Sequence, residues 1–362
     1  MPIREKSFRI GCGRYLQEVG ILQSCGEEVM RVGHAPLIVS GKTALQLTRQ
    51  QIESSVRAQC PHYHIEEYRG TCNDENASVM VQLARRERLD VIIGVGGGVM
   101  MDFAKLIGRF ASLPVINIPT SSATCAAYTP LSVRYTPDGC TVGSLHHERE
   151  VDAVLADPAI IATQPTRLLL SGVFDALAKF VEIKQRYREG GDCPLGLDFA
   201  YEMSKYSFRL LSEKTATCIA DLQAGTVSAD FESLVFTTIA ATGVISGIAR
   251  GSNQCALAHK FYEITRKLFN RQALPYLHGE IVGVGLLLQN RFNSETEKNG
   301  ELLELMRRHG MPHRVTDVGV PCTEESFCEY YNRLRDSSAI DETNADECAR
   351  LNAALRYLWE MD

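Results

Sequence analysis

The chain has 362 residues, of which 45% are hydrophobic and 23% charged, and its formal net charge is −6 at pH 7. These values are typical of a globular protein with room for two domains, and the negative charge argues against nucleic-acid binding. The twelve cysteines form no CxxC pair, the first fourteen residues lack the apolar core of a signal peptide, and no apolar run reaches the ~18 residues of a membrane span. We therefore expect a cytoplasmic protein that neither enters nor binds a membrane.

Up to about residue 160, short β-rich runs alternate with helical stretches. The expected strands are Pro36–Ser40, His62–Tyr68, Asp90–Ile93 and Val115–Ile118, and the expected helices are Ala44–Ala58, Ala77–Arg88 and Met101–Arg109. This alternation predicts a parallel sheet with helices on both faces. Leu131–Thr136 and Val151–Ala156, with Pro137-Asp138-Gly139 between them, are expected to form an additional hairpin.

A glycine-rich turn follows the third of these strands. Gly94, Gly96, Gly97 and Gly98 lie between the apolar run Val91–Ile93 and the next helix. Glycine lets a backbone approach an anion closely, and a helix N-terminus offers unpaired N–H groups and a positive dipole end. The turn indicates a phosphate site, although an ordinary tight connection would also use glycine.

After Pro165 the β signals stop and the pattern becomes helical. The expected helices are Arg167–Arg188, Leu195–Ser212, Phe231–Ile245, Cys255–Phe269, Glu280–Asn293 and Glu301–Arg308. The predicted fold class is α/β. A doubly wound, parallel-sheet nucleotide-binding domain spans residues 1–160, and an all-helical domain for metal and substrate spans 161–362.

Potential metal ligands lie in three segments of the helical half. Asp175 sits within the apolar run Leu168–Val181, Cys255 and His259 are four residues apart, and His278 precedes a helix. A buried carboxylate needs a compensating charge, and Asp, Cys and His together could hold one divalent cation with a position left open, as catalytic zinc sites do. Capping or packing roles for the histidines, and pairing of Asp175 with a lysine, remain open alternatives.

Together these motifs resemble the iron-containing alcohol dehydrogenase superfamily, in its glycerol dehydrogenase-like section, closest to the hydroxycarboxylate dehydrogenase branch. The matching segments are Gly94–Lys105, Pro119–Thr124, Pro130–Gly139, Asp175–Lys179 and Leu277–Glu280. The resemblance implies reversible hydride transfer between an alcohol carbon and NAD(P), with the active site in a cleft between the two domains.

The resemblance also assigns roles to individual residues. It places Gly96, Gly97, Gly98 and Asp102 along the cofactor pyrophosphate, Thr120 and Thr124 on the nicotinamide side, and Thr129, Leu131 and Tyr135 near nicotinamide and substrate. Asp175 and His278 match two metal ligands of the family, and Cys255 stands at the third. A thiolate there favours zinc over iron or magnesium. His259 is an alternative ligand or the proton donor. Loss of the metal, with His278 or His259 left as the proton donor, is a further alternative.

Two departures from the glycerol dehydrogenase pattern bear on substrate and cofactor. Cys125 replaces an Asp that helps to hold the polyol, so the resemblance favours small 2-oxo or 2-hydroxy carboxylates over glycerol. Lys179 or Arg250 could clamp the substrate carboxylate, or Lys179 could simply pair with Asp175 at i, i+4. Gly41 and Lys42 follow the first strand where NAD-selective members carry an acid, which favours NADP over NAD.

Three other functions remain open for such a chain. These are a glycerol dehydrogenase, a dehydroquinate synthase-like lyase that uses NAD transiently, and a non-catalytic remnant that binds nucleotide without a metal. We expect its partners to be a small-molecule substrate and further copies of the chain in a homo-oligomer.

Overall fold

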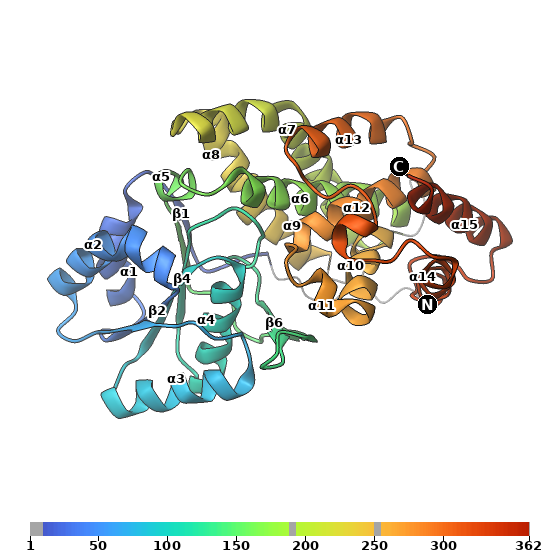
Figure 1. Cartoon of the computed structure of the whole chain (residues 1–362). Coiled ribbons are helices and arrows are strands. Elements are labelled where there is room, and N and C mark those ends of the chain that lie inside the picture. The colour runs from blue at the N-terminus through green and yellow to red at the C-terminus, as the bar shows by residue number, and fades with distance from the viewer. Residues whose placement is uncertain (1–9, 188–192, 250–254, 362) are drawn as a thin grey trace. The chain divides into compact units, whose positions relative to one another are not determined.

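The computed structural model describes residues 10–187, 193–249 and 255–361. The chain divides into two compact units. The sheet unit takes in residues 10–165 and 213–247, and the helical unit takes in the described residues of 166–212 and 248–361. The predicted class, a parallel sheet with helices followed by a helical region, is confirmed (Figure 1).

Six parallel strands form the centre of the sheet unit, in the order β1-β8-β5-β4-β2-β3. Their bounds are Tyr15–Gln17 (β1), Pro36–Ser40 (β2), His64–Glu67 (β3), Val91–Gly96 (β4), Val115–Pro119 (β5) and Ala153–Ala156 (β8). Every residue of β2, β4, β5 and β8 is buried. Continuous apolar runs of this kind are typical of strands covered on both faces.

Helices cover both faces of this sheet (Figure 1). Their bounds are Cys25–Met30 (α1), Lys42–Gln59 (α2), Asp74–Glu87 (α3) and Gly98–Ala111 (α4). Ile93 and Val95 of β4 share a buried cluster with Ile52 of α2. Gly94 points to the opposite face, where a Cβ would lie 2.5 Å from the Cβ of Ala104 in α4. Glycine at position 94 therefore allows α4 to pack directly on its own strand.

The predicted hairpin has a different second strand. Leu131–Tyr135 (β6) pairs antiparallel with Thr141–His146 (β7), whereas the run Val151–Ala156 contains β8, which pairs parallel with β1 and β5. The different burial of β7 and β8 explains why the predicted pairing of the hairpin is wrong. Residues of β8 are fully buried, as in a central strand, while β7 alternates between half-buried and exposed residues, as in a hairpin with one solvated face.

The sheet unit also contains Pro158–Ile161 (α5), Ala229–Phe236 (α8), the π-helical turn Thr237–Ala241 and Thr242–Gly247 of α9 (Thr242–Ile248). The continuous stretch Ala229–Ile248 is long and apolar enough to span a membrane, but 67% of its most apolar window is buried. Such burial is typical of a core helix in a soluble protein.

The helical unit is built around α12. Its helices are Thr166–Arg186 (α6), Leu257–Leu268 (α10), Asn270–Ala273 (α11), His278–Phe292 (α12), Lys298–Arg308 (α13), Glu324–Arg335 (α14), Ala345–Trp359 (α15) and the first part of Leu195–Ala224 (α7). Helix α12 packs against α6, α10 and α15. A Cβ at Gly279 would lie 1.8 Å from the backbone oxygen of Ser171 in α6, and one at Gly285 would lie 2.6 Å from that of Ala258 in α10. Two glycines thus let α12 approach both neighbours closely.

Candidate active site

The glycine turn joins β4 to α4 at the carboxyl edge of the sheet. Gly96 has a φ of 153°, which favours glycine, and Gly97 caps α4. Thr120 donates its backbone N–H to the Gly96 carbonyl at 2.9 Å, which fixes the turn to the end of β5. A Cβ at Gly97 would meet nothing closer than Ser121 Oγ at 3.7 Å. An anion can therefore approach the N-terminus of α4 over Gly97.

Gly41 and Lys42 lie at the same edge. Strand β2 runs parallel beside β4, with Ser40 opposite Val95, so the residues after each strand emerge side by side. Gly41 caps α2, a Cβ there would have no neighbour within 4 Å, and Lys42 is exposed. The end of β2 thus presents a lysine rather than a carboxylate beside the glycine turn.

Asp102 and Lys105 connect α4 to the segment that follows β5. Lys105 is 3% exposed, and its Nζ lies 2.8 Å from Asp102 Oδ1. The same ammonium donates to the carbonyls of Ala126 (2.6 Å), Thr129 (2.9 Å) and Leu131. Asp102 Oδ2 accepts from the backbone N–H of Val133 at 3.0 Å. These contacts give Asp102 a structural role, and its expected place along the pyrophosphate stays a prediction.

Lys105 shapes the loop that carries most of the residues expected near nicotinamide and substrate. The Cys125 carbonyl accepts from the N–H groups of Tyr128 (3.0 Å) and Thr129 (3.2 Å), and Thr124 Oγ1 accepts from Ala126 N–H at 3.2 Å. Farther along, the Tyr135 N–H donates to the Cys72 carbonyl at 2.9 Å. Thr124, Cys125, Thr129 and Leu131 therefore belong to one tight loop and its continuation into β6.

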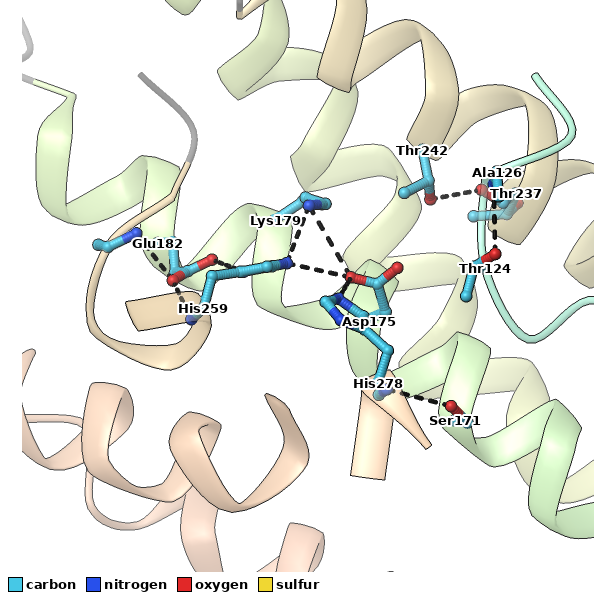
Figure 2. A network of polar contacts seen from close by, with 12 residues as sticks. Thr124, Ala126, Ser171, Asp175, Lys179, Glu182, Thr237, Thr242, His259 and His278 are labelled. Carbon is cyan, nitrogen blue, oxygen red and sulfur yellow. Dashed lines mark hydrogen bonds and ion pairs between the residues drawn. The ribbon is translucent and has the colours of Figure 1, made fainter. Parts of the chain in front are cut away.

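A buried polar cluster lies in the helical unit (Figure 2). Asp175 of α6 is 4% exposed, and its Oδ1 lies 3.1 Å from His259 Nε2 of α10 and 3.4 Å from His278 Nε2 of α12. Candidate ligand atoms of the three residues all lie within 4.8 Å of one another. The close contact between Gly279 of α12 and Ser171 of α6 explains why these three side chains lie together. Ser171 is one helical turn before Asp175, so the neighbour of Gly279, His278, is brought next to Asp175.

Glu182 orients His259. Its Oε2 lies 2.5 Å from His259 Nδ1, while its Oε1 accepts from the backbone N–H groups of His259 (2.9 Å) and Ala256 (2.8 Å). Burial opposes the charge of both groups. The Glu182 carboxylate nevertheless raises the pKa of His259, and the pKa of Glu182 itself is lowered. Nδ1 therefore carries a proton, and Nε2 points toward Asp175.

Burial and neighbouring charges also oppose each other at Asp175 and His278. Burial raises the pKa of Asp175, but Lys179, His278 and His259 outweigh it and hold that pKa well below its usual range. Burial lowers the pKa of His278 despite the opposing Asp175 carboxylate. At neutral pH, Asp175 is therefore ionised and His278 is neutral.

Lys179 reaches into this cluster from the next turn of α6. It is 5% exposed, and its Nζ lies 3.1 Å from His259 Nε2 and 3.8 Å from Asp175 Oδ1 (Figure 2). A hydrogen bond needs one donor and one acceptor, so Nζ and Nε2 share a single proton. The i, i+4 pairing of Asp175 and Lys179, one of the two alternatives left open by the sequence, is present.

The residues expected to bind metal are only partly brought together. Cys255 falls in a different group, with Glu182 and His259, and its carbonyl accepts from Arg186 Nε at 2.8 Å. The compact set around Asp175 contains His259 instead, so the ligand set Asp175, Cys255 and His278 stays a prediction. Arg250 lies outside the described residues.

The donor types of Asp175, His259 and His278 suit zinc, but the position of Lys179 does not. A metal needs the lone pair of His259 Nε2, which is the atom that shares a proton with Lys179. A divalent ion about 3 Å from an ammonium group would also be repelled by about 11 kcal/mol at an effective dielectric constant of about 20. With Lys179 in this place, the cluster does not fit a divalent metal.

Glu182 and Ser171 are site residues that the sequence analysis missed. Asp175, Lys179 and Glu182 are spaced i, i+4, i+7, which puts them on one face of α6. A second carboxylate on that face, within a run otherwise apolar, was the signal available. Ser171, which accepts from Gly279 N–H at 3.2 Å, carried no comparable signal.

The family model for iron-containing alcohol dehydrogenase matches residues 12–158. The glycerol dehydrogenase of Thermotoga maritima is 29% identical over 95% of this chain and 96% of its own length. Hydroxycarboxylate dehydrogenase A of Escherichia coli is 29% identical over 72% of this chain and 71% of its own length. The solved glycerol dehydrogenase of Schizosaccharomyces pombe, 20% identical, covers 98% of this chain and 90% of its own with a TM-score of 0.81, which shows a shared fold. Residues 12–158 therefore match the iron-containing alcohol dehydrogenase family, and similarity to named dehydrogenases over most of the chain indicates an alcohol-type dehydrogenase.

Proposed function

We propose that the protein transfers a hydride between NAD(P) and a small 2-hydroxy or 2-oxo carboxylate. The observation that carries this proposal is one chain holding both an anion-accepting glycine turn and a buried, charged cluster. The turn follows β4, and the cluster joins Asp175, Lys179, Glu182, His259 and His278. A nucleotide-binding turn and a polarising cluster are the two parts that carbonyl reduction by a nicotinamide requires.

The sheet unit would bind the cofactor. Its pyrophosphate would lie over Gly97 at the N-terminus of α4, where the N–H groups and the helix dipole stabilise negative charge. The adenosine ribose would then lie toward the end of the neighbouring strand β2, near Lys42. A lysine attracts a 2′-phosphate and an acid would repel it, which supports a preference for NADP(H).

The substrate class is supported by Cys125 and by one relative. A carboxylate at position 125 would repel an anionic substrate, whereas a thiol would not. The E. coli relative is named for hydroxycarboxylates. Lys179 and Arg250 are the basic residues that could accompany such a substrate.

Steady-state assays with a panel of 2-oxoacids, dihydroxyacetone and simple aldehydes, each with NADPH and with NADH, would test the proposal. We expect the highest kcat/KM for a 2-oxoacid with NADPH. Stronger turnover of dihydroxyacetone than of every 2-oxoacid would contradict the substrate class, and tighter binding of NADH would contradict the cofactor preference.

Glycerol dehydrogenase is the second candidate function. It is favoured by the T. maritima relative, which matches nearly the whole chain. Oxidation of glycerol with NAD(P) in the same panel separates it from the first candidate, because the carboxylate proposal expects glycerol to be a poor substrate.

We further propose that the protein acts in the cytoplasm as a homo-oligomer. Cys25, Cys60, Cys72 and Cys218 are buried as free thiols, which suits a reducing compartment. Sedimentation velocity of the purified protein would test the oligomeric state, and a monomer would contradict it.

A further inference from the structure

Lys179 holds a position that is unusual for a lysine. It is 5% exposed, and its ammonium lies among the acceptor atoms that in a metal site would hold the cation, 3.1 Å from His259 Nε2 and 3.8 Å from Asp175 Oδ1. His278 Nε2 faces the same carboxylate oxygen at 3.4 Å. The cluster thus already surrounds one positive charge, which the protein supplies from its own helix α6.

We propose that the Lys179 ammonium is the cation that polarises the substrate carbonyl, in place of a divalent metal. This inference rests on the proposed dehydrogenase function. The neighbouring residues suit the role. Asp175 keeps the positive charge in place, and Glu182 fixes the His259 ring through Nδ1, so that Nε2 faces Lys179. His278, 30% exposed on its side chain, stands at the more open side of the group.

The step balances without a metal. A hydride leaves C4 of NAD(P)H with its electron pair and forms a C–H bond to the carbonyl carbon. The π electrons of the C=O bond move to oxygen, which takes a proton from Lys179 Nζ and becomes the hydroxyl. Lys179 is then neutral and recovers a proton from water. The products are the 2-hydroxy acid and NAD(P)⁺, and the overall reaction consumes one proton.

The competing explanation is that Lys179 only balances the charge of Asp175, or moves aside when a metal binds. Metal analysis of the holoprotein distinguishes these cases. We expect wild-type enzyme, purified without chelator and then incubated with Zn²⁺ and desalted, to hold far less than one zinc per chain. We also expect its activity to survive dipicolinate. Stoichiometric zinc whose removal abolishes activity would overturn the proposal while leaving the dehydrogenase function intact.

Two substitutions sharpen the test. Lys179→Ala removes the ammonium and leaves Asp175, His259 and His278 in place, so we expect this variant to bind zinc where the wild type does not. Zinc titration by calorimetry reads this directly and does not depend on activity. We expect Lys179→Met, of similar volume but uncharged, to lose about 10²-fold or more in kcat/KM. Lys184→Ala, on the exposed side of the same helix, is the matched control and should stay near wild type.

Chemical rescue tests the charge itself. In Lys179→Ala kept free of metal, methylammonium or ethylammonium should restore part of the lost kcat, while a neutral molecule of similar size should not. Binding of NADPH, followed by its fluorescence, should be unchanged in both variants. Full activity of metal-free Lys179→Met would overturn the proposal. If the wild type turns over no substrate of the panel, the proposed function fails, and the zinc titration still decides whether Lys179 occupies the cation position.

Discussion

Gly279 donates its backbone N–H to Ser171 Oγ at 3.2 Å, so the first turn of α12 rests directly on α6. A Cβ at this position would lie 1.8 Å from the backbone oxygen of Ser171. Gly279→Ala must therefore push the two helices apart and carry His278 away from Asp175. We expect it to lower the free energy of unfolding by about 1–3 kcal/mol or more, measured by urea denaturation.

Gly300 provides the matched control. It lies in α13 with nothing within 4 Å of its Cβ position. Gly300→Ala should stabilise the protein by less than about 1 kcal/mol, because it only reduces the freedom of the unfolded chain. Equal stability of the two variants would contradict the close approach of α12 and α6.

Gly97→Val should abolish binding of NADPH and NADH. The new side chain has room within the protein, since its nearest neighbour would be Ser121 Oγ at 3.7 Å. It would fill the space into which a pyrophosphate is expected to fit. Fluorescence titration measures the binding, and a thermal melt close to that of the wild type shows that the fold is kept. Unchanged affinity would mean that the nucleotide binds elsewhere.

Lys42→Ala should weaken NADPH binding by about 10-fold, the value of one charged hydrogen bond, and leave NADH binding unchanged. The comparison variant is Arg49→Ala, which removes a charge from an exposed position on the same helix. Dissociation constants of NADPH and NADH for both variants test whether Lys42 contacts the 2′-phosphate. A parallel loss for NADH and NADPH would show that Lys42 does not contact the 2′-phosphate.

Cys125→Asp should shift specificity from 2-oxoacids toward dihydroxyacetone. A carboxylate at this place in the loop repels an anionic substrate, and about 1.4 kcal/mol of repulsion reduces kcat/KM about 10-fold. Cys328→Asp adds the same charge at an exposed cysteine of α14 and should have no effect. An unchanged ratio of the two kcat/KM values in Cys125→Asp would place the substrate away from residue 125.

His147 makes stability depend on pH. Burial, and then Lys105 and Arg109, lower its pKa from 6.5 to about 4, and its Nε2 lies 2.7 Å from Ser132 Oγ. Between these two values the unfolded chain binds a proton that the folded chain does not. Stability therefore falls as the pH drops from 6.5 toward 4, by about 3 kcal/mol in total. Urea denaturation at several pH values should show this slope, and His147→Gln should flatten it. The exposed His62 is the control, because His62→Gln should keep the slope.

Local pattern was enough to predict much of the fold. The apolar runs Pro36–Ser40 and Val115–Ile118 are strands within a residue of their predicted bounds, and the glycines at 96–98 form the turn between β4 and α4. The prediction of strand pairing was wrong where a strand could pair with either of two neighbours. Ala153–Ala156 could pair with either neighbour by propensity, and only its complete burial shows that it belongs in the main sheet.

The candidate site was less predictable, since its members come from three helices. Asp175 and His278 were identified from the sequence and lie together. His259 lies beside them, whereas Cys255 falls in a different group. We attribute this arrangement to the way in which α10 and α12 cross. That crossing depends on Gly285, whose Cβ would strike the Ala258 backbone, and such a steric relation leaves no periodic trace in the sequence.

Lys105 gives the loop after β5 an unusual tolerance. Its ammonium donates hydrogen bonds to the backbone carbonyls of Ala126, Thr129 and Leu131. Every amino acid supplies such a carbonyl, whatever its side chain. These contacts hold the backbone of the loop through main-chain carbonyls, whichever side chains the loop carries at those three positions. A library randomised at Cys125 alone should therefore keep the loop shape, which Lys105 holds through the backbone, and vary the chemistry at that one position.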